Sequence, residues 1–103
     1  MVFNLFPRSA QNTKYTIRAI SNLVYSVTLD GSYGANVTTF DLEAYAGDTV
    51  TYATKSNVVV TTSSSGTPVS SNLIDTFKVG KFNTYSVYQF TMPNDSVVIN
   101  LSS

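Results

Sequence analysis

The 103-residue chain contains no cysteine and no histidine. A disulfide framework, a thiolate nucleophile and a Cys/His zinc site are therefore impossible, and a Ser-His-Asp triad would lack its base. Only 12% of the residues are charged, and six Lys and Arg balance six Asp and Glu. This composition provides no basic field to attract phosphates, so nucleic acid is not expected as a partner.

Long apolar runs are also absent. No stretch approaches the roughly eighteen apolar residues of a membrane-spanning helix, so no membrane partner is expected. Asn4 and Pro7 interrupt the apolar start of the chain, which also lacks the basic region of a signal peptide. The sequence therefore predicts a protein made in a cytoplasm.

Aromatic and hydroxyl side chains make up much of what is present. There are seven Tyr and six Phe residues, whereas the strong helix formers Glu, Lys and Arg are scarce. This balance favours strands. Turn residues recur about every ten positions between alternating runs, the spacing expected of a sandwich. We predict one domain over residues 13–103, an all-β sandwich of seven or eight antiparallel strands.

The C-terminal twenty residues hold the strongest alternation. Tyr88, Phe90 and Met92 share one face, and Val97 and Ile99 share a face after a Pro-Asn-Asp-Ser turn. Proline cannot donate to a ladder, so the first strand should end there and the chain should reverse. We predict a closing β-hairpin.

Two earlier runs also alternate. Residues 23–29 place Leu23, Tyr25, Val27 and Leu29 on one face, which should lie in the core, and Asp30-Gly31 ends this strand. Residues 36–44 place Thr38, Phe40, Leu42 and Ala44 on the inward face of another strand. The polar stretch 61–72 is predicted to be a loop. Residues 73–79 suggest either one helical turn or, because Gly80 follows so soon, a strand.

The segment Phe90-Thr91-Met92-Pro93, followed by Asp95 and the alternating Val97-Val98-Ile99, resembles the end of immunoglobulin-like modules repeated in bacterial surface proteins, including internalin-type B-repeats. Residues 46–52, Ala-Gly-Asp-Thr-Val-Thr-Tyr, resemble the turn and strand entry of the same modules. The resemblance implies an immunoglobulin-like sandwich used for display, spacing or adhesion, without catalytic residues or a cofactor.

A small free-standing domain of this type is similar to the decoration or auxiliary proteins that coat tailed-phage capsids. This likeness implies a non-enzymatic structural protein of the virion, made in the host cytoplasm, that binds a capsid protein, another virion protein or neighbouring copies of itself. The alternative is a carbohydrate-binding or adhesion module at a bacterial cell surface.

The first candidate binding residues lie in the segment 1–12. Burying each large apolar side chain is worth roughly 1.5 to 3 kcal/mol, so this segment should dock on a surface. It forms either an edge strand on its own domain or an arm that reaches a neighbouring subunit. The residues concerned are Val2, Phe3, Leu5 and Phe6.

Tyr33 and Tyr45 adjoin glycine-containing turns and are the tyrosines most expected to be exposed. Together with the 61–72 loop they would form the glycan-binding surface of the alternative function, because flat aromatic rings stack on sugars. Asp41 and Glu43 share one strand face and could bind a hard cation. The carboxylates are better explained as turn residues and a solvated strand face, so we predict no metal site and no catalytic residues.

Overall fold

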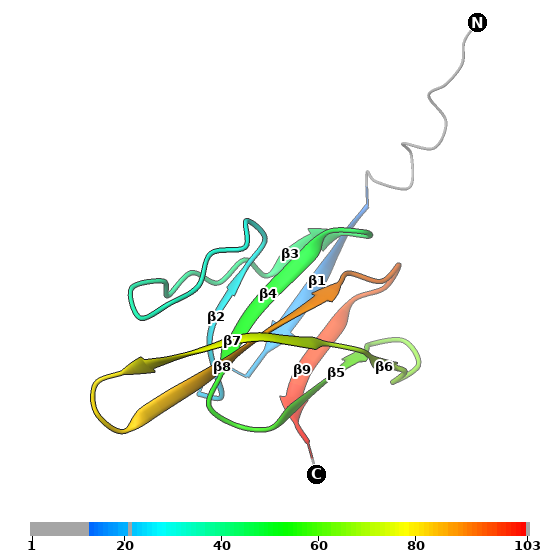
Figure 1. Ribbon diagram of the computed structural model, residues 1–103. Coiled ribbons are helices and arrows are strands. Elements are labelled where there is room, and N and C mark those ends of the chain that lie inside the picture. Colours follow the sequence, from blue (N-terminus) through cyan, green and yellow to red (C-terminus); the bar gives the residue numbers. More distant parts are fainter. Residues whose placement is uncertain (1–12, 21, 103) are drawn as a thin grey trace, which may run out of the picture.

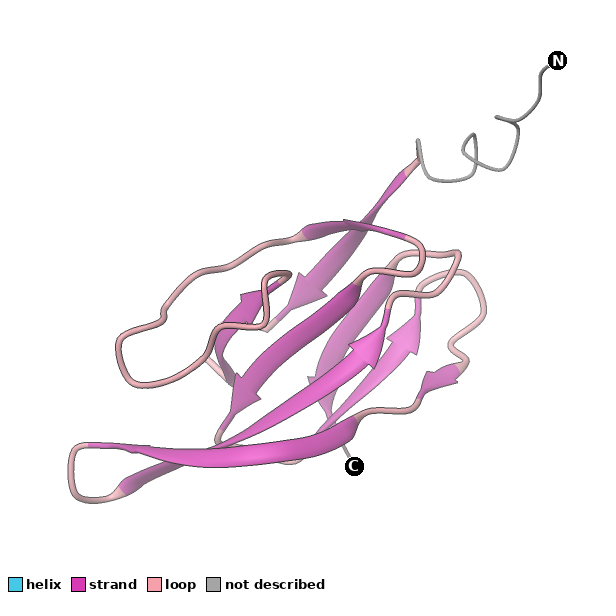
Figure 2. Ribbon diagram, turned by 45° about the horizontal axis from the view of Figure 1, so that its top comes forward, coloured by secondary structure: helices cyan, strands magenta, loops and turns pink. Residues whose placement is uncertain are grey.

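The computed structural model describes residues 13–20 and 22–102, and these form two packed β-sheets (Figure 1). Figure 2 shows the two layers with loops at both ends. Within the described residues there is no helix, and hence none that could span a membrane. The nine strands are β1 (Lys14–Ala19), β2 (Val24–Thr28), β3 (Glu43–Tyr45), β4 (Thr49–Thr54), β5 (Val58–Thr62), β6 (Pro68–Val69), β7 (Asn72–Val79), β8 (Asn83–Thr91) and β9 (Val97–Leu101).

One sheet has the order β3-β1-β9-β5-β6 and the other β2-β4-β8-β7. The predicted all-β sandwich is confirmed. It has nine strands rather than seven or eight among the described residues, because short pieces such as Pro68–Val69 pair within the predicted 61–72 loop. One pair is parallel rather than antiparallel: β1 runs alongside β9, with Ile17 opposite Val97. Residues 72–79 form a strand and not a helical turn.

The core lies between the sheets. It is built from side chains that alternate inward on both layers, as the period of two requires. Its buried members are Ile17, Val24, Val27, Ala44, Val50, Tyr52, Val60, Phe90, Met92, Val97 and Ile99.

The predicted closing hairpin is wrong. β8 and β9 lie in different sheets, so residues 92–96 carry the chain from one layer to the other instead of joining neighbouring strands. Met92 N–H donates to Asp48 O at 2.8 Å and Met92 O accepts from Gly47 N–H at 2.9 Å, which ties this crossing to the turn before β4. Phe90 and Ile99 consequently face the core from opposite sides.

The strand predicted over 36–44 is wrong for residues 36–42, because only Glu43–Tyr45 is a strand, and of the residues predicted to face inward Ala44 is buried in the core. Residues 39–42 run along the open edge of the sandwich and bond to both sheets. Val27 N–H donates to Thr39 O at 2.8 Å, and Ile17 N–H donates to Leu42 O at 2.8 Å. Because its backbone is hydrogen-bonded to both sheets, this segment cannot insert its side chains into the core. Phe40 and Leu42 are consequently 38% and 43% exposed.

The inward face predicted for residues 23–29 is wrong in part. A register shift between Val24 and Ser26 puts Val24 and Val27 in the core and moves Tyr25 to the outer face. There the Tyr25 ring packs against Tyr85 and Phe77, with centroids 4.6 Å and 5.7 Å away. A bulge changes the face of every later residue, and alternation alone gives no sign of it.

Tyr52 is the largest fully buried side chain, 2% exposed. Its ring stacks on Tyr88 with centroids 5.4 Å apart, and its hydroxyl donates to Ser71 Oγ at 3.0 Å. Burial raises the pKa of the Tyr52 phenol above its ordinary value.

We expect this shift to make the fold sensitive to alkali. The buried, protonated Tyr52 phenol contributes its full stabilisation of the fold below the unfolded-state pKa of about 10. This stabilisation is lost as the pH rises through the folded-state pKa, because the phenol ionises first in the unfolded chain. Tyr52→Phe should cost about 0.5–1.5 kcal/mol near pH 8 through the lost hydrogen bond, yet lose less stability than the parent protein when the pH is raised. Urea unfolding of both proteins on either side of the tyrosine range measures this difference, and equal losses would contradict it.

Candidate functional site

The predicted binding residues Val2, Phe3, Leu5 and Phe6 lie outside the described residues. Of the sequence-predicted candidates, the structure therefore places Tyr33, Tyr45 and the 61–72 segment.

Tyr33 is 36% exposed, in the long connection between β2 and β3. Its hydroxyl donates to Asp75 Oδ2 on β7 at 3.0 Å, and this hydrogen bond to a carboxylate raises the pKa of Tyr33. The connection lies over the outer face of the four-stranded sheet, because Tyr25 Oη also donates to Ala35 O at 2.6 Å. At its start, hydrogen bonds from the hydroxyl and amide of Ser32 lower the pKa of Asp30.

Tyr45 is half-buried on β3, at one edge of the five-stranded sheet. The Lys14 ammonium lies 5.4 Å from its ring centroid, a cation–π contact. Residues 62–69 lie at the opposite edge, where Ser64 Oγ donates to Asp95 Oδ1 at 2.9 Å. Tyr45 and residues 62–69 therefore lie at opposite edges of the five-stranded sheet, whereas Tyr33 lies against β7 of the other sheet.

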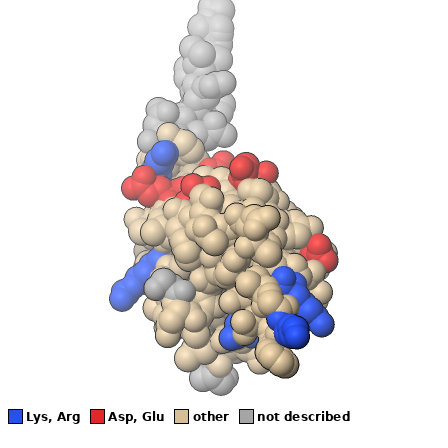
Figure 3. Space-filling view, turned by 90° about the vertical axis from the view of Figure 1, so that its left-hand side faces the viewer, with Lys and Arg blue, Asp and Glu red and all other residues tan. Residues whose placement is uncertain are grey.

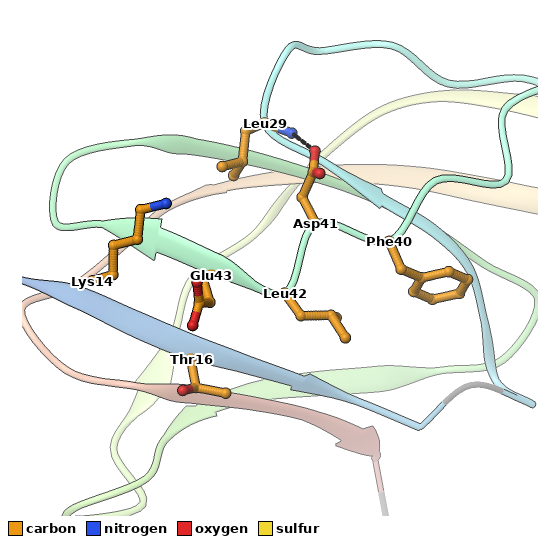
Figure 4. Close-up of a pocket in the computed structure, with 7 residues that line it drawn as sticks. All are labelled: Lys14, Thr16, Leu29, Phe40, Asp41, Leu42 and Glu43. Carbon is orange, nitrogen blue, oxygen red and sulfur yellow. Dashed lines mark hydrogen bonds between the residues drawn. The ribbon is translucent and has the colours of Figure 1, made fainter.

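A hollow of about 550 Å³ opens beside the start of β1 (Figure 4). Phe40 and Leu42 lie along one part of it and Glu43 along another. The Asp41 carboxylate accepts the Leu29 N–H at 3.1 Å, so it is held by the backbone. Among the described residues, no three His, Cys, Asp or Glu side chains gather to hold a metal ion. The lining residues are Lys14, Thr16, Leu29, Phe40, Asp41, Leu42 and Glu43.

The β7–β8 hairpin carries the most exposed large apolar side chain of the described residues. Phe82 is 92% exposed, in the turn that begins at Gly80. Gly80 has φ 72°, a left-handed conformation that glycine adopts without strain. The stacked rings of Phe77 and Tyr85, 5.5 Å apart, brace the strands below the tip, and Lys55 Nζ donates to Asn83 Oδ1 at 3.1 Å beside it.

Charges of opposite sign gather at opposite ends of the sandwich. The acidic end is where β1 and β4 begin and β8 ends, and it includes Lys14 as its one cation among the described residues. The basic end is where β1 and β4 end and the β7–β8 hairpin turns. Figure 3 shows this separation on one face. Asp30, Asp41, Glu43, Asp48 and Asp95 lie toward the acidic end, Arg18, Lys55, Lys78 and Lys81 toward the basic end, and Asp75 between them.

Sequence reasoning missed both Phe82 and the hollow. A signal existed for Phe82, since it stands between Gly80-Lys81 and Asn83, residue types that favour a turn over a core strand. The hollow had no comparable signal, because the run 36–44 alternates as a buried strand would.

The fold and these surfaces define a small all-β sandwich with two chemically opposite ends. Comparison of the chain with protein-family models, with curated proteins and with solved structures finds no match.

Proposed function

We propose that this protein is a non-enzymatic structural module that acts by binding other proteins. The observation that carries the proposal is the 92% exposure of Phe82 at the end of a braced hairpin. A large aromatic side chain held in water contributes nothing to the core, whereas aromatic residues are enriched where proteins meet. The hollow beside β1, where Phe40 and Leu42 lie among charged and polar residues, offers a second contact surface.

In its specific form, the proposal is a virion component of a tailed phage that decorates the capsid. It would bind the shell or neighbouring copies through residues 1–12 and the loops of the sandwich. The resemblance of residues 90–99 to immunoglobulin-like display modules supports this form, and so does the low charge, which puts little electrostatic repulsion between packed copies.

Deleting residues 1–12 is expected to leave a folded sandwich that no longer joins virus particles. Residues 13–20 and 22–102 by themselves form both sheets and the core between them, so circular dichroism and thermal unfolding should show the parent fold. Quantitative mass spectrometry of purified particles would give the copy number of each form relative to the shell protein. A variant with serine at Val2, Phe3, Leu5 and Phe6 keeps the chain length and should behave like the deletion.

Two results would count against this proposal. Absence of the full-length protein from purified particles would refute the virion role. Unfolding of the shortened chain would assign residues 1–12 to the protein's own core instead of a partner.

A further inference from the structure

We infer that copies of this chain associate head to tail, with the β7–β8 hairpin tip of one copy docked in the hollow beside β1 of the next. The inference rests on the proposed function only in taking the chain to be a protein-binding module. It names a second copy of the chain as a partner and assigns the two surfaces that meet.

The hairpin tip has the features of an inserted anchor. Phe82 projects from a turn only three residues long, between Val79 and Asn83, which pair across the hairpin. Its exposure of 92% leaves nearly the whole ring available for contact. The rings of Tyr25, Phe77 and Tyr85 pack together below it, so little conformational freedom is lost when the tip is bound.

The hollow has the features of a receptor for such an anchor. Its volume of about 550 Å³ lies within the range of roughly 300–1,000 Å³ typical of ligand pockets. Phe40 and Leu42 present apolar surface there because the segment 39–42 bonds to both sheets and cannot turn inward. Burying Phe82 against these two side chains would remove the apolar surface of both partners from water.

Charge selects this pairing over others. Lys81 and Lys78 accompany Phe82 at the tip. The hollow is lined by two carboxylates, Asp41 and Glu43, and by one cation, Lys14, so negative charge predominates there. Hairpin-to-hollow contact brings opposite charges together, while contact between two hairpin tips or two hollows brings like charges together. The net charge of the chain is zero, so it gives no sign that acidic and basic residues are separated at opposite ends. Because the two surfaces differ, a head-to-tail pair leaves one hairpin tip and one hollow unused, so the assembly either closes into a ring or extends as a chain.

Sedimentation velocity over a range of concentrations tests the inference. The parent protein should form species larger than a monomer, and Phe82→Ser should weaken association by about tenfold or more, as expected for a central aromatic anchor. Leu73→Ser is the matched control, because Leu73 is 60% exposed on β7 but lies away from the tip. It should associate like the parent protein.

Charge reversal separates the two surfaces. Lys81→Glu alone and Glu43→Lys alone should each weaken association. An equimolar mixture should restore it, because each variant keeps one unaltered surface and the two altered surfaces now complement each other. Glu43 is chosen over Asp41, whose carboxylate holds the Leu29 amide. Failure of the mixture to exceed the separate variants would overturn the pairing.

The absence of cysteine makes cross-linking unambiguous. Lys81→Cys mixed with Leu42→Cys should form a disulfide-linked dimer under mild oxidation, whereas Ser64→Cys, at the other edge of the five-stranded sheet, should not link to Leu42→Cys. Linkage of Leu42→Cys to Phe6→Cys but not to Lys81→Cys would show that residues 1–12 occupy the hollow and would overturn the inference. So would a parent protein that stays monomeric up to about 1 mM, a concentration at which even weak specific pairing is visible. Such a monomer found in virus particles would leave the proposed function intact.

Discussion

Ile99→Asp is expected to unfold the sandwich at neutral pH. Ile99 is fully buried on β9, opposite Ala19 on one side and Val60 on the other. A carboxylate at this position would lie in an apolar core without a charged partner, which costs several kcal/mol in addition to the apolar burial that is lost. The free energy of unfolding of a whole domain is only about 5–15 kcal/mol, so this single change removes most or all of it. Far-UV circular dichroism and urea unfolding would measure the loss.

The neighbouring residue provides the control. Asn100→Asp introduces the same charge on the same strand, but Asn100 is exposed and its Oδ1 accepts the Leu101 N–H, a role that aspartate can fill. We expect a change within about 0.5 kcal/mol. Comparable destabilisation by both variants would show that β9 does not lie in the core.

The pH dependence of Ile99→Asp gives a second check. Burial disfavours the charged form, so the folded-state pKa of the new carboxyl lies above the unfolded value of about 3.9. The stability deficit relative to the parent protein should therefore shrink as the pH falls through the folded-state pKa, and it should be smallest below the unfolded pKa, where the carboxyl is neutral in both states. A deficit independent of pH would contradict a buried carboxyl.

Alternation identified the strands well because it depends on local sequence only. Tyr88, Phe90 and Met92 must share a face whatever their strand pairs with. Alternation does not determine which strands pair with each other. A hairpin and a crossing between sheets both need two alternating runs separated by a break at Pro93. What places β9 in the other sheet is its contact with Val58–Thr62 and with Ile17–Ala19, far away in the sequence.

The error at residues 36–44 has a related cause. Phe40 and Leu42 alternate as core residues do, but the backbone at 39–42 completes the hydrogen bonding of both sheet edges at once. A segment held by two layers cannot also insert its side chains between them. The hollow is a product of this arrangement. Of the two tyrosines expected to be exposed, Tyr33 is exposed in a loop, as its neighbours Ser32 and Gly34 indicate, whereas Tyr45 is half-buried on β3.

Phe90→Ala is expected to lower the free energy of unfolding by about 3–5 kcal/mol. Phe90 is 3% exposed, opposite Val50 on β4, and its ring centroid lies 5.9 Å from that of Tyr52. Truncation would leave a cavity that the paired strands β4 and β8 cannot collapse to fill. For a domain of this size the melting temperature should fall by more than about 10 °C. Thermal unfolding followed by near-UV circular dichroism is a suitable measurement.

Phe82→Ala is the matched control, because it removes the same atoms from the same β7–β8 hairpin. With 92% of its surface in water, Phe82 has almost no burial to lose, and we expect its stability change to stay within about 0.5 kcal/mol. A large loss from Phe82→Ala would mean that this ring supports the fold and is not free to bind a partner. The difference in unfolding free energy between the two variants therefore tests whether, on a single hairpin, Phe90 stabilises the fold while Phe82 remains available to bind a partner.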